Sequence, residues 1–159
     1  MKPTNILFIT VLVLFVQTIT AQITPIETVT EAKKTTYKAN SFDNYNVAFK
    51  NQSYELMQKL QRRIKLIDTV DLSFVRVCLN ETTNDSIVNN NTVLYIEYIV
   101  NQDGDVMSCS LINYGFIVSI TNTEIECILE NALNNQFNFT NVPTEVNQFY
   151  LKIKKRYIP

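Results

Sequence analysis

The chain has 159 residues, a formal net charge of −1 and no histidine. A charge this close to balance argues against nucleic acid or an anionic membrane as the main partner, because both bind strongly basic surfaces. The missing histidine excludes Ser-His-Asp and Cys-His catalysis, imidazole metal sites and a histidine pH switch. We therefore expect a non-enzymatic protein that holds no metal and no cofactor.

Residues 1–21 have the parts of a cleavable secretory signal. Lys2 precedes an apolar run at 6–16, and polar residues then lead to Ala21 before Gln22. The run is shorter than the about 20 apolar residues that a membrane-spanning helix needs, which disfavours the alternative of a retained anchor. We expect export, a mature chain that begins at Gln22, and no membrane span after cleavage.

Two segments follow the signal. Residues 22–46 are rich in Thr, Lys and Asn and have few large apolar side chains, so we predict a flexible tether. Residues 47–159 are long enough for one domain with its own core. Within that domain we predict an α+β fold, with an antiparallel sheet of about four strands packed by two helices.

The first half of the domain contains one amphipathic segment and one apolar run. Apolar residues recur at three- and four-residue intervals in 53–67, with basic residues between them, which predicts a helix. Residues 72–79 are rich in β-branched and aromatic side chains and predict a strand. The polar segment 80–92 then predicts a loop.

The second half begins with a predicted hairpin. Residues 93–100 predict a strand with Leu94, Ile96, Tyr98 and Val100 on one face. Residues 106–114 form a second predicted strand after Asp103-Gly104, a dipeptide that tolerates the positive φ of a tight turn. Asp103 and Asp105 also admit an enzymatic alternative as an acid pair, but carboxylates at a hairpin tip are usually solvated turn residues.

The chain ends in a predicted helix and strand. Thr121 and Glu124 have the spacing of a capping box, and Thr123 and Glu126 offer the same spacing slightly later, so we expect a helix that starts at one of these two positions and stops near Asn134. Residues 146–157 alternate strongly and predict a terminal strand.

Three cysteines allow at most one internal disulfide. We predict that Cys78 pairs with Cys127, which lies on the side of its helix opposite the apolar stripe. Cys109 lies on a strand expected to face the core, where cysteine behaves as a small apolar residue, and we expect it to stay a buried thiol. Spacing alone leaves the other pairings open.

Residues 92–158 resemble the C-terminal domain of the TonB family of bacterial envelope proteins, with its order of strand, hairpin, strand, helix and strand. The matching positions are Leu94, Ile96, Tyr98, Val100, Asp103-Gly104-Asp105-Val106, Cys109, Leu111, the helix at 125–133, Phe137, Phe139, Phe149, Leu151 and Ile153. TonB proteins pair a strand of this domain with a short transporter segment and draw energy through an uncleaved membrane helix. Because this chain has a cleavable signal and no long proline-rich spacer, the resemblance implies the fold and the binding mode, and it does not imply energy transduction.

The resemblance also implies a site. In the TonB-like fold the C-terminal strand lies at a sheet edge, and here its outward face carries Tyr150, Lys152, Lys154 and Arg156. We expect a protein or an extended peptide to bind there by β-strand addition. Lysines on an edge strand also prevent unwanted pairing, so the same residues could serve only solubility.

The predicted function is thus a periplasmic or extracellular interaction module of the bacterial envelope, accessory to outer-membrane transport. The alternative is a small secreted cystatin-like binder or inhibitor, because a helix followed by antiparallel strands is also the outline of that fold.

Overall fold

The computed structural model describes residues 27–31, 33–67, 70–115, 118–146 and 148–159. The strands are β1 (Glu27–Glu31), β2 (Lys34–Lys38), β3 (Lys65–Leu66), β4 (Val93–Asn101), β5 (Val106–Tyr114), β6 (Phe139–Thr140) and β7 (Tyr150–Tyr157). The helices are α1 (Phe42–Lys50), α2 (Tyr54–Arg63), α3 (Ser73–Cys78), α4 (Glu81–Asn89) and α5 (Asn122–Leu133).

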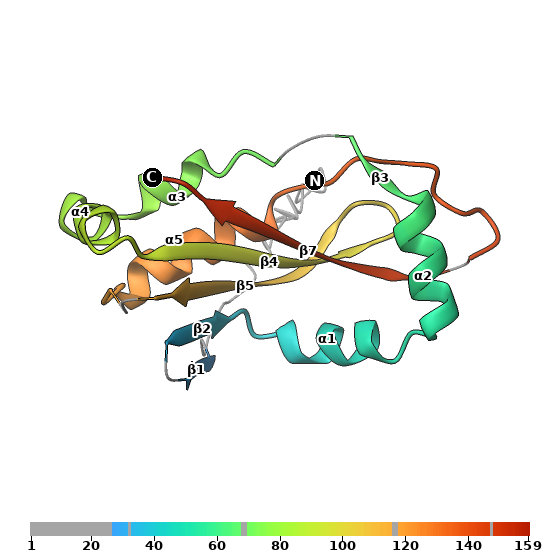
Figure 1. Ribbon diagram of the computed structural model, residues 1–159, viewed down its shortest axis with the longest axis horizontal. Coiled ribbons are helices and arrows are strands. Elements are labelled where there is room, and N and C mark those ends of the chain that lie inside the picture. The colour runs from blue at the N-terminus through green and yellow to red at the C-terminus, as the bar shows by residue number, and fades with distance from the viewer. Residues whose placement is uncertain (1–26, 32, 68–69, 116–117, 147) are drawn as a thin grey trace, which may run out of the picture.

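Five strands form one antiparallel sheet in the order β1-β2-β5-β4-β7 (Figure 1). Strand β3 pairs with β6 in a second sheet. This architecture confirms the predicted α+β class. The main sheet has five strands where about four were predicted, and the described part of the chain has five helices where two were predicted.

The β4–β5 hairpin forms as predicted. Asn101 Oδ1 accepts hydrogen bonds of 2.9 Å from the backbone N–H groups of both Asp103 and Asp105, which fixes the turn. Gly104 has a φ of 91°, a conformation that glycine adopts without a steric penalty. Phe137 donates its N–H to the Gly104 carbonyl at 2.8 Å, so the turn also packs on the chain that follows α5.

One face of the sheet forms the core with α5. Leu94, Ile96, Tyr98 and Val100, which alternate along β4, are all completely buried on this face. Helix α5 begins with the predicted capping box between Thr121 and Glu124. Its apolar stripe is buried against the sheet, and its members are Ile125, Ile128, Leu129 and Ala132.

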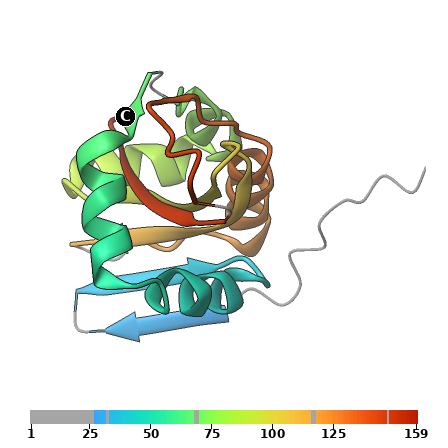
Figure 2. The same cartoon turned by 90° about the vertical axis from the view of Figure 1, so that its right-hand side faces the viewer.

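Helix α1 covers part of the opposite face. Cys109 of β5 contacts Leu129 of α5. Because successive side chains alternate across a strand, the neighbouring Ser108 lies on the face away from α5. Ser41, which precedes α1, donates a 3.1 Å hydrogen bond to Ser108. Helix α1 also contacts β4 and β7, and Figure 2 shows it next to β1 and β2.

The predicted tether at 22–46 is wrong over residues 27–31 and 33–46, which form β1, β2 and the start of α1. Strand β2 pairs with β5 along five residues, and Thr35, Tyr37, Ala39 and Phe42 are at most 9% exposed. The segment has few large apolar side chains, but threonine and tyrosine favour strands. The few apolar side chains that it has lie at positions that the fold buries. Residues 22–26 and the predicted signal at 1–21 lie outside the described part of the chain.

The predicted strand at 72–79 and the predicted loop at 80–92 are also wrong, because the structure forms helices α3 and α4 there. A short apolar run fits a buried helix as well as a strand, and periodicity alone does not separate them. The start of α4 is fixed by Asn80, whose side chain accepts a 2.8 Å hydrogen bond from the Thr83 N–H.

The predicted helix at 53–67 is confirmed in its main part as α2, which begins after the Ser53 cap. The predicted terminal strand at 146–157 corresponds to β7, which starts at Tyr150. Among the described helices, none is long and apolar enough to cross a membrane.

Candidate functional site: the edge of strand β7

Strand β7 pairs with β4 on one side only, so its other side is an edge of the main sheet. The β4–β7 register is continuous from Leu94↔Tyr157 to Asn101↔Tyr150. In an antiparallel pair, successive residues of a strand turn their N–H and C=O groups alternately toward the partner and away from it. Every second residue of β7 therefore presents its backbone groups to the edge.

Gln52 shows which residues those are. Its Oε1 accepts a 2.7 Å hydrogen bond from the Tyr150 N–H, and its Nε2 donates a 2.9 Å bond to the Tyr150 carbonyl. The backbone N–H and C=O groups of Tyr150 thus point outward, and by alternation those of Lys152, Lys154 and Arg156 do so as well. Gln52 closes the edge at the start of β7, and in the described part of the chain no hydrogen bond reaches the outward N–H of Lys154 or Arg156.

Two of the four predicted partner-binding residues have internal roles. The Tyr150 ring packs edge-on against Tyr45, with 5.8 Å between centroids. The Lys152 ammonium lies 3.3 Å from Glu97 and donates a 2.8 Å hydrogen bond to Asn46. Its ammonium also lies over the rings of Phe42 and Phe49, at 5.7 Å and 5.3 Å from their centroids. The Lys152 side chain therefore holds α1 on the sheet and is not free for a partner.

The other two predicted residues are exposed. The Lys154 ammonium lies 4.2 Å from the centroid of the Tyr95 ring, which is a cation–π contact that leaves its charge accessible to solvent. Arg156 lines a cleft at the C-terminal half of β7. Of the four predicted residues, the exposed ones are thus those in the second half of the strand.

The cleft has a volume of about 720 Å³ and lies between the end of β7 and the segment that leads into α3. Residues 155–159 form one wall, and residues 70–73 with Arg76 form the other. Sequence reasoning missed Arg76 and Lys155, because it placed Arg76 on a strand and gave no sign that α3 lies beside β7.

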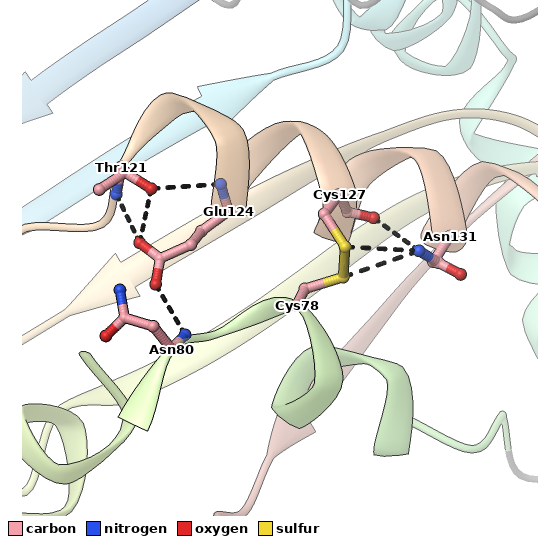
Figure 3. Close-up of a disulfide and its surroundings, with 6 residues drawn as sticks. All are labelled: Cys78, Asn80, Thr121, Glu124, Cys127 and Asn131. Carbon is pink, nitrogen blue, oxygen red and sulfur yellow. Dashed lines mark hydrogen bonds between the residues drawn. A yellow bond between two sulfur atoms is a disulfide. The ribbon is translucent and has the colours of Figure 1, made fainter. Parts of the chain in front are cut away.

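The second cleft wall is anchored by the predicted disulfide. Cys78 at the end of α3 is bonded to Cys127 of α5, with their Cα atoms 5.5 Å apart (Figure 3). Asn131 donates a 2.8 Å hydrogen bond to the Cys127 carbonyl beside the bond. Cys109 is a buried free thiol, as predicted, and burial raises the pKa of this thiol, which keeps it protonated at neutral pH.

The described residues include no group of three potential metal ligands among their cysteines and carboxylates. Asp105 is engaged in the hairpin turn, where it accepts hydrogen bonds from Asn101 at 3.1 Å and Gln136 at 3.4 Å. The second half of β7 combines outward backbone groups, the exposed cations Lys154 and Arg156, and an adjoining cleft.

No family model and no curated protein matches the sequence. Among solved structures, the fold is similar to a DUF5043 family protein from Bacteroides uniformis, with a TM-score of 0.49 and 12% sequence identity. The alignment covers 84% of this chain and 85% of that protein.

Proposed function

We propose that the protein is an exported, non-enzymatic module of the bacterial envelope that binds an extended segment of another protein by strand addition at β7. The observation that carries this proposal is the unpaired outward side of β7 over its second half. An added strand would gain backbone hydrogen bonds from Lys154 and Arg156, and the neighbouring side chains would supply selectivity.

Export is proposed from the signal-like residues 1–21. The resemblance of residues 92–158 to the TonB C-terminal domain supports an envelope protein as the partner and a role accessory to outer-membrane transport. The disulfide between Cys78 and Cys127 supports a location outside the cytoplasm, because such bonds persist in oxidising compartments.

The proposal is tested by Lys154→Pro, which removes an outward N–H and leaves the β4 pairing intact. Proline is tolerated on an edge strand where its missing N–H would face solvent. Lys154→Ala is the matched control, because it removes the same side chain and retains the N–H. We expect peptides selected from a random display library on the wild-type protein to lose about tenfold in affinity to the proline variant, and much less to the alanine variant.

Circular dichroism must show that both variants are folded. Hydrogen exchange provides a second readout, because an added strand should protect the Lys154 and Arg156 amides of the wild-type protein. Selected peptides that bind the folded proline variant as tightly as the wild type, without protecting these amides, would show that the β7 edge is not the binding site.

A further inference from the structure

The cleft beside β7 determines what kind of segment fits the open edge. A strand added to the second half of β7 would lie between that strand and residues 70–73, the wall that leads into α3. Because residues 70–73 and the end of β7 line the same cleft, we expect side chains on that side of an added strand to contact both β7 and this second wall. Backbone pairing alone would not distinguish partner sequences, but this wall can.

The cleft is basic. Arg76, Lys155 and Arg156 line it, and in the described part of the chain none of them forms an ion pair. Asp71 adds one carboxylate side chain to the same lining, and this carboxylate accepts hydrogen bonds from the Ser73 N–H at 2.8 Å and the Ser73 hydroxyl at 2.7 Å. Three basic residues and one acidic side chain therefore line the cleft, which leaves an excess of positive charge in its lining.

The register fixes where an incoming charge would go. Lys155 pairs with Ile96 of β4, so its side chain lies on the α5 face of the sheet, and its backbone groups point toward β4. A residue of an added strand directly opposite Lys155 would form a non-hydrogen-bonded pair, in which opposing side chains come closest. That side chain would share the α5 face with Tyr157, next to Arg76 on the other wall.

We propose that the partner segment carries a carboxylate at the position opposite Lys155, and that this carboxylate enters the cleft between Lys155 and Arg76. The inference rests on the proposed strand addition and names the chemistry of the added strand: an extended acidic segment of another protein. Val70 and Leu72 give the same wall an apolar part, which suits aliphatic residues beside the carboxylate.

The probes are two fluorescein-labelled peptides of alternating valine and threonine that differ at one central position, glutamate in one and glutamine in the other. Their affinities for the full chain are measured by fluorescence anisotropy at low and high salt. We expect the glutamate peptide to bind about tenfold more tightly at low salt, and the difference to shrink at high salt because exposed charges are screened.

Arg76→Gln and Lys155→Gln should each remove most of the preference for glutamate. Arg62→Gln, an identical change on the exposed face of α2 away from the cleft, should leave the preference unchanged. Lys154→Pro should weaken both peptides equally, because it acts on the backbone pairing that they share.

The outcomes separate the two proposals. Equal affinity for both peptides, lost in Lys154→Pro, would overturn acidic selection and leave strand addition standing. A glutamate preference that disappears in Arg76→Gln but is insensitive to Lys154→Pro would keep the cleft as an anion site and overturn strand addition. A preference that persists in both Arg76→Gln and Lys155→Gln would place recognition elsewhere, and a lack of binding by either peptide would contradict both proposals.

Discussion

Gly104 and Gly115 both have a positive φ, at 91° and 108°, but only at Gly104 does the Cβ position face another backbone segment. A Cβ on Gly104 would overlap the Phe137 carbonyl oxygen, whereas a Cβ on Gly115 would meet nothing within 4 Å. We expect Gly104→Ala to lower the free energy of unfolding by about 3 kcal/mol, through backbone strain and steric overlap together. Gly115→Ala, which adds only the strain, should cost about 1 kcal/mol.

Urea denaturation followed by circular dichroism measures both variants. Equal losses at the two glycines would mean that the hairpin tip does not pack on the chain after α5.

Glu124 joins the starts of two helices, as Figure 3 shows. Its carboxylate accepts hydrogen bonds from the Thr121 N–H and hydroxyl at 2.8 Å each, and from the Asn80 N–H at 2.9 Å. Burial alone would raise the pKa of Glu124, but the hydrogen bonds from Asn80 and Thr121 outweigh it and lower the pKa. The ionised form is therefore bound more strongly in the folded protein than in the unfolded chain.

A carboxyl group with a lowered folded-state pKa stabilises the protein above its unfolded pKa of about 4.3, and this contribution is lost as the pH falls through the folded pKa. We expect Glu124→Gln to reduce the free energy of unfolding by about 1–2 kcal/mol at neutral pH, and the gap to the wild type to close in acid. Glu130→Gln, an exposed position on the same helix, serves as the control. A gap that stays constant from neutral pH to pH about 3 would contradict this assignment.

At the scale of single elements, α3 depends on its link to α5. The disulfide between Cys78 and Cys127 closes a loop with a sequence separation of 49, for which the chain-entropy estimate is about 4 kcal/mol. We expect the double variant Cys78→Ser, Cys127→Ser to lose roughly 2–4 kcal/mol and to show no further loss in reductant. Reduced wild-type protein should match this variant in urea denaturation, and a wild-type stability that is indifferent to reductant would indicate that the bond does not form in solution.

The same link should matter for binding, because α3 carries Arg76 and follows the 70–73 wall of the cleft. We expect the double serine variant, under conditions where it remains folded, to bind the acidic probe peptide more weakly than the wild type. This loss would come from the greater mobility of residues 70–73 and Arg76 without the disulfide, because the substitutions remove no side chain that lines the cleft.

The elements that sequence reasoning found are those in which local pattern and tertiary packing agree. The alternation in β4, the Asp103-Gly104 turn and the Thr121 capping box each predict the observed element directly. Helices α3 and α4 were missed because α3 is too short to show a helical period and α4 is rich in Asn, Thr and Ser. The Asn80 cap was a usable signal for α4, but the polar composition after it favoured a loop.

The candidate site was predictable only in part. Alternation placed Tyr150, Lys152, Lys154 and Arg156 on one face of the last strand. Sequence alone could not show that Gln52 hydrogen-bonds the Tyr150 backbone or that Asn46 of α1 hydrogen-bonds Lys152. These contacts join residues about a hundred positions apart in the chain. Arg76 was missed for the same reason, since its position beside β7 depends on the packing of α3.

At the scale of the whole molecule, the N-terminal elements complete the sheet and are not an appendage to it. Strand β2 pairs with β5 along five residues, and α1 lies across β4, β5 and β7. Phe42 of α1 is 4% exposed, and Tyr37 of β2 is 9% exposed. The predicted domain boundary at residue 47 would therefore cut through α1 and remove β1 and β2.

Two truncated chains would test that boundary. A chain of residues 47–159 would expose the edge of β5, lose two buried aromatic side chains worth roughly 2–3 kcal/mol each, and leave Lys152 without Phe42 and Asn46. Because a domain is stable by only about 5–15 kcal/mol in total, we expect this chain to be unfolded or aggregated. A chain of residues 27–159 should retain the cooperative thermal transition of the longer protein. Circular dichroism and size-exclusion chromatography distinguish the two, and a monomeric, cooperatively folded 47–159 chain would show that the N-terminal elements dock on a domain that is already complete.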